Sequence, residues 1–332
     1  MSICKLAVIG SNAFSAQDFI DLVLDETDAD IIGISRSAEK PAPFLRYRHN
    51  PAQGRFRFHQ LDLNNDFPAL AALLDREKPD CIVNFAAQSE VGPSWEHPEQ
   101  WFRTNCVALA RLVNHLRGTD YLERYLHISS PEAYGSCSGN VTEETPDNPS
   151  TPYAASKAAA DMLIETYRRQ YGFPALTVRA TNVYGARQQL FKIIPRSVIY
   201  MRQGRRIPLH GGGVAVKSYI HIRDVSAGEL AILQRGRVGE RYHLSPDQGI
   251  SIRDLVAEIA RRMDRDFADV TDIVGERPGQ DAAYVISSAK ARKELGWKPR
   301  ITLEEGIGEV ADWIGAHWDF IQAQEMDYVH RP

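Results

Sequence analysis

The stretch KLAVIGSNAFSA, residues 5–16, decides how the chain begins to fold. Its first half is a short apolar run, as expected of a buried parallel strand. Its second half is a turn of small residues that leads into a helical pattern. Backbone amides and the helix dipole at such a turn favour a phosphate group. The stretch therefore predicts a strand–turn–helix unit at a nucleotide diphosphate, although the turn alone is also compatible with an ordinary connection.

The turn is poor in glycine. Dinucleotide-binding turns carry glycine at three positions, whereas this chain has Gly10, Ala13 and Ala16. Ala13 adds a methyl group near the phosphate and does not adopt a positive φ cheaply. The residues of this turn predicted to bind the cofactor are Gly10, Asn12, Ala13, Phe14 and Ser15.

The pattern of the first unit repeats along the chain. Further apolar runs cover 30–35, 81–87, 125–130 and 175–182. Helical patterns cover 15–27, 67–78, 98–117 and 153–172, and later 251–263 and 302–318. This alternation predicts a doubly wound parallel α/β sheet, a Rossmann fold, in which ligands bind at the carboxyl ends of the strands. We expect a dinucleotide-binding domain over 1–185 and a smaller substrate-binding α/β region over 186–332, with possible chain crossovers between them.

Composition excludes several classes of partner. The chain has 332 residues, of which 43% are apolar, and a net charge of −4, so it has no electrostatic basis for binding nucleic acid. It contains no apolar run long enough for a membrane span and no signal-peptide pattern, so we expect a cytoplasmic protein. The four cysteines and ten histidines lack the spacing of metal ligands. We therefore expect reduced cysteines and no metal.

The second apolar run ends at Ser35, and Arg36 follows it. A carboxylate at this point would bind the ribose of NAD, whereas a guanidinium suits a 2′-phosphate. Arg36 therefore favours NADP over NAD, although a surface arginine after a strand is an alternative.

Tyr153 and Lys157 lie one helical turn apart in the pattern YAASK. A phenol with a pKa near 10 is a poor base at neutral pH, but a neighbouring ammonium and an oxidised nicotinamide would lower that pKa. Ser130 directly follows the run YLHISS and is suited to align a substrate hydroxyl. The three residues predict a hydride-transfer site in which Tyr153 removes a hydroxyl proton.

Together these segments resemble an extended short-chain dehydrogenase/reductase of the NAD(P)-dependent nucleotide-sugar epimerase/dehydratase family, above all its dTDP-glucose and GDP-mannose 4,6-dehydratases. The resemblance spans residues 5 to about 315. The matching segments are LDL at 61–63, NFAAQSEV at 84–91, TN at 104–105, SSPEAYG at 129–135, YAASK at 153–157, RATNVYG at 179–185, ERPGQD at 276–281 and ELGW at 294–297.

The resemblance implies roles for further residues. It implies cofactor contacts at Asp62, Leu63, Ala86, Ala87 and Gln88, together with Tyr153 and Lys157. It implies substrate contacts at Gln88, Ser89, Glu132, Asn182, Lys192, Lys217 and Arg277. Lys217 stands where relatives usually carry arginine, so bidentate phosphate binding is lost there. The resemblance also implies a homodimer formed through the helices around 98–116 and 153–171, although an internal core explains their apolar faces as well.

Glu132 points to the reaction within the family. The resemblance implies that its carboxylate removes the proton at carbon 5 of a 4-keto sugar, so that water leaves from carbon 6 and a 4-keto-6-deoxy sugar forms. Pro131 replaces the aspartic acid of the dTDP-glucose enzymes and cannot donate a proton. We therefore predict a nucleotide-sugar 4,6-dehydratase. The alternatives are a 4-epimerase, a UDP-glucuronate-type decarboxylase and an inactive NAD(P)-binding sensor or scaffold.

Overall fold

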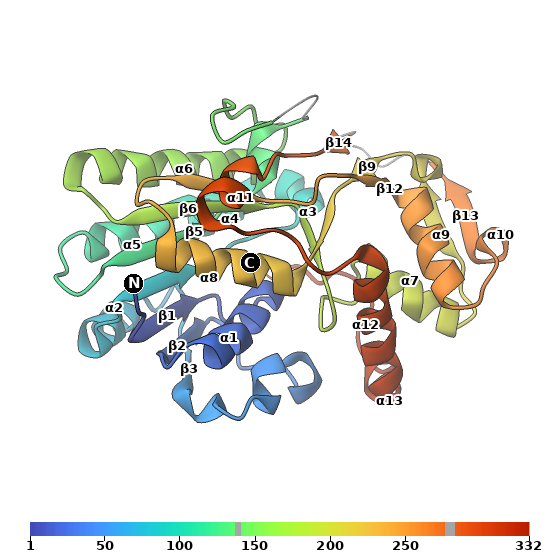
Figure 1. Cartoon of the computed structure of the whole chain (residues 1–332), viewed down its shortest axis with the longest axis horizontal. Helices are drawn as coiled ribbons and strands as arrows, with labels where there is room; N and C mark the ends of the chain where they lie inside the picture. Colours follow the sequence, from blue (N-terminus) through green and yellow to red (C-terminus); the bar gives the residue numbers. More distant parts are fainter. Residues whose placement is uncertain (137–140, 276–282, 332) are drawn as a thin grey trace.

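The computed structural model describes residues 1–136, 141–275 and 283–331. Within these residues the largest sheet has seven parallel strands in the order β11-β6-β5-β4-β1-β2-β3 (Figure 1). Their bounds are β1 Lys5–Ile9, β2 Asp30–Ser35, β3 Phe56–Gln60, β4 Cys81–Asn84, β5 Arg124–Ile128, β6 Ala175–Ala180 and β11 Arg241–Leu244. The predicted doubly wound α/β fold is confirmed.

Burial explains which strands the sequence revealed. The central strands β1 and β4 are apolar and almost fully buried, as strands with helices on both faces must be. The strand β3 lies at the edge of the sheet and is only partly buried, so its sequence FRFHQ lacks a continuous apolar run. β3 was therefore not predicted. β11 was not predicted either, although it is largely buried, because it has only four residues, RYHL, and two of them are Arg and His.

Helices cover both faces of this sheet. On one face α1 (Phe14–Glu26) packs against α8 (Ile222–Arg235), and the other face carries α2, α5 and α6. Their bounds are α2 Phe67–Glu77, α5 Leu109–Leu116 and α6 Pro152–Tyr171. The Thr151 hydroxyl caps α6 by accepting a hydrogen bond from the backbone N–H of Ala154, and Gly172 ends the helix with a positive φ.

The helix predicted over 98–117 is not continuous. It comprises α4 (Pro98–Phe102), a π-helical segment η4 (Arg103–Ala108) and α5. Such segments shift the side chains that follow relative to a regular helix, and they occur frequently at functional sites.

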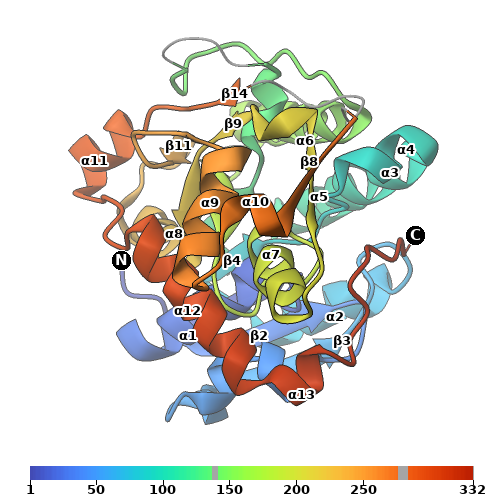
Figure 2. The ribbon, with the colours of Figure 1, turned by 90° about the vertical axis from the view of Figure 1, so that its right-hand side faces the viewer.

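The carboxyl-terminal elements form a second unit with its own core (Figure 2). Its main elements are α7 Ile193–Arg202, β8 Ile207–His210, α9 Ile252–Arg262, α10 Phe267–Val270, β13 Thr271–Val274, α12 Leu303–Ala316 and α13 Trp318–Ile321. Short strands connect the units: β7 Asn182–Tyr184, β9 Val216–Lys217, β10 Tyr219–His221, β12 Ile250–Ser251 and β14 Ala283–Tyr284. Between these elements the chain returns to the first unit through α8 and β11 and then packs α11 (Ala289–Leu295) beside them.

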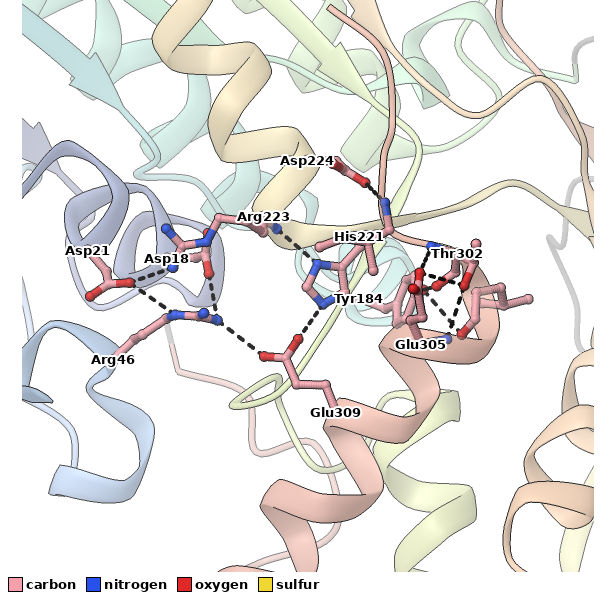
Figure 3. A network of polar contacts seen from close by, with 12 residues as sticks. Asp18, Asp21, Arg46, Tyr184, His221, Arg223, Asp224, Thr302, Glu305 and Glu309 are labelled. Atoms are coloured by element: carbon pink, nitrogen blue, oxygen red, sulfur yellow. Dashed lines mark hydrogen bonds and ion pairs between the residues drawn. The ribbon is translucent and has the colours of Figure 1, made fainter. Parts of the chain in front are cut away.

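A charge network joins the two units (Figure 3). Glu309 on α12 lies 3.2 Å from Nη1 of Arg46 and 2.9 Å from Nε2 of His221. Arg46 also pairs with Asp18 and Asp21 on α1, each at 3.0 Å. The network ties α12 to α1, the helix that follows the turn at residues 10–13.

None of the described helices is both long and apolar enough to cross a bilayer. Across the same described residues, no group of three His, Cys, Asp or Glu side chains is arranged to hold a metal ion.

Candidate active site

A cavity of about 710 Å³ opens at the carboxyl ends of β1, β2 and β4. The strand order reverses between β1 and β4, and open α/β sheets bind ligands at this point. The predicted residues that line the cavity are Gly10, Asn12, Ala13, Arg36, Asp62, Leu63, Ala86, Ala87, Gln88 and Ser89. Residues from separate segments thus meet at one cavity, whose volume is typical of a cofactor site.

Gly10 allows two backbone segments that line this cavity to approach each other closely. Its φ is +85°, and a Cβ atom there would lie 2.5 Å from the backbone nitrogen of Ala86. Ala13 has an ordinary φ of −64° and caps α1, so alanine causes no backbone strain at that position. The turn therefore needs glycine where β1 approaches the segment after β4, and alanine at position 13 fits its backbone.

Phe14 and Ser15 are not among the described residues that line the cavity. The Phe14 side chain is buried in the core of the first unit instead. Both residues lie in the first turn of α1, where backbone amides have no partner within the helix. Any contact of Phe14 and Ser15 with a cofactor would therefore be made by their backbone amides, and this role stays a prediction.

Two cations line the cavity beyond the end of β2. The Arg36 guanidinium donates a hydrogen bond to the backbone carbonyl of Arg331 at 3.0 Å. Lys40, which the sequence analysis missed, is half-buried, and burial lowers its pKa to about 8. The sequence signal for Lys40 was weak, because a lysine in a polar loop is usually solvated.

The predicted catalytic residues meet beside this edge of the sheet. Tyr153 and Lys157 lie in the first two turns of α6. Ser130 lies just before the short 3₁₀ helix η5 (Pro131–Tyr134) that follows β5, and Glu132 lies within it. The Tyr153 hydroxyl shares a hydrogen bond with the Ser130 side chain. Lys157 is buried, and its Nζ donates to the Ile128 carbonyl at 2.8 Å.

The predicted lowering of the Tyr153 pKa is wrong as far as the protein's own groups are concerned, because they raise this pKa. Burial raises the pKa of the phenol first, and the negative charge of Glu132 raises it further, while the hydrogen bond with Ser130 opposes them. Burial also lowers the pKa of Lys157 to about 8. The physical reason is that Lys157 is directed to a backbone carbonyl in an enclosed site, where charge is poorly solvated.

A buried ion-pair network lies beneath Lys157. Asp161, one helical turn further along α6, accepts hydrogen bonds from Ser129 at 2.7 Å and from Arg179 at 2.6 Å. Arg179 is completely buried and also donates to Asp147 at 2.7 Å. Burial is the largest single influence and would raise the pKa of Asp161, but the charges of Arg179, His127 and Arg241 and the hydrogen bond from Arg179 together lower that pKa. The network holds the middle of α6 against the end of β5 and against β6.

Tyr153 is not among the described residues that line the cavity, but three contacts connect the two. Asn105 in η4 accepts from the backbone N–H of Gln88 at 2.9 Å and donates to the Gln88 carbonyl at 3.0 Å. The same Asn105 amide donates to Ser156 on α6 at 2.9 Å. Glu90 lines the cavity, and its charge also raises the Tyr153 pKa. Asn105 and Glu90 therefore link the cavity wall to α6 and to Tyr153, although Tyr153 itself does not line the cavity.

Asn105 is a functional candidate that the sequence analysis named only as part of a matching segment. Its importance depends on the π-helical turn, which directs its side chain to Gln88 and Ser156 together. Ser94 on α3 (Val91–Glu96) was also missed, and its hydroxyl accepts from the backbone N–H of Tyr153 at 3.2 Å.

The predicted substrate residues are spread over both units. Lys192 precedes α7 and forms an ion pair of 2.7 Å with Glu90 at the cavity. Asn182 begins β7 and donates to the Ser218 carbonyl at 3.2 Å, and Lys217 ends β9. Arg277 lies outside the described residues.

Comparison with known proteins identifies the family. The family model for GDP-mannose 4,6 dehydratase matches residues 14–310. A dTDP-glucose 4,6-dehydratase of Mycolicibacterium smegmatis is 32% identical over 324 residues, 94% of each chain. The crystal structure of the dTDP-glucose 4,6-dehydratase of Streptomyces venezuelae, with NAD bound, is 30% identical, covers 95% of this chain and 98% of its own, and superposes with a TM-score of 0.85.

A second solved structure, the dTDP-glucose 4,6-dehydratase of Bacillus anthracis in complex with NAD, is 26% identical, with a TM-score of 0.85 and coverage of 96% of this chain and 98% of its own. The family model, over residues 14–310, spans parts of both units and includes the Tyr153–Lys157 helix. The chain therefore belongs to the GDP-mannose 4,6 dehydratase family of extended short-chain dehydrogenases/reductases.

Proposed function

We propose that this chain is a nucleotide-sugar 4,6-dehydratase that converts an NDP-hexose to an NDP-4-keto-6-deoxyhexose with bound NAD(P). The observation that carries the proposal is the position of Glu132, whose negative charge acts on the Tyr153 phenol beside Ser130. A carboxylate next to the hydride-transfer group is what elimination from a 4-keto sugar requires. The similarity to dTDP-glucose 4,6-dehydratases supports the same reaction.

The residues divide the chemistry between them. Tyr153 takes the proton from the 4-hydroxyl as the hydride leaves carbon 4, and Ser130 holds the sugar oxygen through its hydroxyl. A dinucleotide held by cavity residues such as Gly10, Asp62 and Gln88 would supply hydride acceptance and donation and a positive charge that favours the phenolate. Because the protein's own groups raise the Tyr153 pKa, the base becomes effective only after the site is loaded. Lys157 contributes its ammonium from the next turn of α6.

Glu132 carries the second half of the reaction. Its carboxylate removes the proton at carbon 5, which the new 4-keto group acidifies, and the hydroxyl on carbon 6 then leaves as water. Pro131 has no proton to donate, so Glu132 also supplies the proton to the departing hydroxyl. Tyr153 would then return the proton that it took from the 4-hydroxyl to carbon 5, and carbon 6 would receive the hydride that carbon 4 lost, so the net change is the loss of one water.

The decisive experiment combines substrates and variants. The purified protein is incubated separately with dTDP-glucose, GDP-mannose, UDP-glucose, UDP-glucuronate and CDP-glucose, and products are followed by mass spectrometry. Loss of one water supports the proposal. An unchanged mass with altered stereochemistry would establish an epimerase, loss of carbon dioxide a decarboxylase, and inertness toward all five a sensor or scaffold.

The two catalytic steps are separable by mutation. Glu132→Gln should perform the first hydride transfer and then stop, so reduced nicotinamide accumulates and is visible by its near-ultraviolet absorbance. Tyr153→Phe should prevent even this absorbance while cofactor binding persists. Full dehydration by Glu132→Gln would contradict the assigned role of the carboxylate.

We infer that NADP is preferred over NAD. Arg36 and Lys40 both line the cavity beyond β2, where a 2′-phosphate would lie. Arg36→Ala should therefore weaken NADPH binding about tenfold more than NADH binding, as for the loss of a charge-assisted hydrogen bond. Titration by fluorescence measures both affinities, and equal losses would contradict the preference.

We also propose a homodimer through α4, α5 and α6. Trp101, Leu109 and Leu112 from the predicted apolar faces are buried in the subunit's own core, but Val107 and Met162 are 51% and 58% exposed. Exposed apolar side chains on neighbouring helices are suited to a partner surface. Met162→Lys should shift the mass measured by light scattering from dimer to monomer, and a monomeric wild type would refute the proposal.

A further inference from the structure

The chain ends in a segment that crosses the cofactor cavity. We call residues 324–331 the strap; they follow α13 and have no regular secondary structure. Figure 2 shows this last part of the chain leaving α13 and ending near α4. Six of its residues line the cavity: Gln324, Glu325, Asp327, Tyr328, Val329 and Arg331. The cavity therefore lies between the strap and the carboxyl ends of the strands.

The far end of the strap is anchored by His330. Its ring stacks with His97 and with Trp101, with centroid distances of 5.3 Å in both cases and interplanar angles of 11° and 12°. Its Nε2 lies 2.7 Å from Oε1 of Gln100. All three partners lie at or within α4, a fixed element of the first unit, so His330 attaches the strap across the cavity from its origin in the second unit.

One backbone carbonyl bridges the opening. The Arg331 carbonyl accepts from Nε2 of Gln88 at 2.8 Å and from Nη2 of Arg36 at 3.0 Å. Gln88 follows β4 and Arg36 follows β2, so these donors come from two sides of the cavity. The strap therefore contacts two side chains that also face the predicted cofactor position.

The strap is held lightly enough to open. Val329 is 58% exposed, and Met326 packs only partly buried against the core of the second unit. Beyond residue 326 the contacts include two ring stacks, an edge-to-face contact between Tyr328 and Phe191, and a few hydrogen bonds. A segment with few buried apolar contacts opens at a much lower free-energy cost than the core. Opening at His330 would expose the cavity without disturbing the sheet.

We propose that the strap is the outer wall of the dinucleotide site and closes over the bound cofactor, so that it controls cofactor exchange. The proposal rests on the proposed function, in which the hydride returns to the same substrate and no cofactor needs to leave during the cycle. A closed wall suits such a reaction because it retains the reduced cofactor until the hydride is returned.

The test measures cofactor release directly. Protein loaded with NADPH or NADH is mixed with an excess of the oxidised form, and the loss of fluorescence gives the dissociation rate. The variants are His330→Ala, which removes the anchor, and a chain ending at Ala323, which removes the strap. Gln322→Ala, an exposed position just before the strap, is the matched control. Hydrogen exchange of the amides of residues 328–331 is followed with and without the reduced cofactor.

We expect both strap variants to release the reduced cofactor at least tenfold faster, the control to stay within twofold of wild type, and the cofactor to slow exchange at 328–331. Unchanged release in both variants would overturn the proposed role of the strap in cofactor exchange while leaving the dehydratase assignment intact. Tighter cofactor binding after truncation would show that the strap competes with the cofactor, and this result would also overturn the proposed role of the strap. Failure of wild type to bind either dinucleotide would overturn both proposals. His330→Ala keeps the test valid if the truncated chain fails to fold.

Discussion

Replacing Glu309 with glutamine removes one charge from the network that joins α12 to the first unit, with little change in shape (Figure 3). In the native protein, contact with His221 lowers the pKa of Glu309 first, and the charges of His221, Arg46 and Arg187 lower it further, to about 2 from an ordinary 4.5. His221 accepts a hydrogen bond at Nδ1 from the backbone N–H of Arg223, which leaves its Nε2 2.9 Å from the Glu309 carboxylate.

The size of the effect follows from proton linkage. A pKa lowered by this amount corresponds to about 3 kcal/mol of stability for a fully shielded group. The Glu309 side chain is 36% exposed, so solvent screening reduces the expected contribution to about 1–2 kcal/mol. Because the native pKa lies below the unfolded one, this stability is present above about pH 4.5 and is lost as the pH falls towards 2.

Urea unfolding at pH 7, 5 and 3 tests this reasoning. The free energy of unfolding of Glu309→Gln should be about 1–2 kcal/mol lower than that of wild type at pH 7 and 5, with the difference shrinking at pH 3. Asp312→Asn, on the same helix with a 77% exposed side chain, is the control and should change little at any pH. A Glu309→Gln deficit that is the same at pH 7 and pH 3 would show that packing, not charge, accounts for it.

Two further substitutions test the site. Gly10→Ala should abolish dinucleotide binding in a fluorescence titration, because the added Cβ would meet backbone atoms of the segment after β4. Gly54→Ala is the control: Gly54 has open space around it, so this variant should bind as wild type does. Normal binding by Gly10→Ala would refute the close approach of the two backbone segments. Asp161→Asn should lower the free energy of unfolding by about 3 kcal/mol, because it leaves the buried Arg179 charge short of a partner. Glu165→Gln, one turn further along α6, removes only surface pairs and should cost less than about 1 kcal/mol; equal losses would contradict the distinction.

The parts of this molecule that could be predicted are those that depend on local pattern. Buried parallel strands are apolar on both faces, so the strands at 5–9 and 81–84 were visible in the sequence, although the second ends earlier than the apolar run 81–87. Tyr153 and Lys157 could be paired because one helical turn separates them. The division at residue 185 stays a prediction, and the return of the chain through β11 shows that sheet membership does not follow it.

The parts that could not be predicted depend on tertiary contacts. Asn105 in the π-helical turn contacts Gln88 and Ser156, which are distant in sequence, so these contacts could not be read from local pattern. The direction of the Tyr153 pKa shift depends on burial, which no spacing reveals. The position of the last eight described residues over the cavity has no local signal at all, because their side chains are mixed and they form no regular element.

The late position of β11 bears on how the chain is synthesised. Residues 241–244 complete the sheet beside β6, which has left the ribosome about sixty residues earlier. Until then β6 is an open edge with unpaired backbone groups, which is where nascent chains associate wrongly. Native pairing here needs a long loop to close, so this step should be slow compared with formation of the first βαβ units. A chaperone that shields this edge would therefore raise the yield of folded protein more than one that acts on the amino-terminal strands.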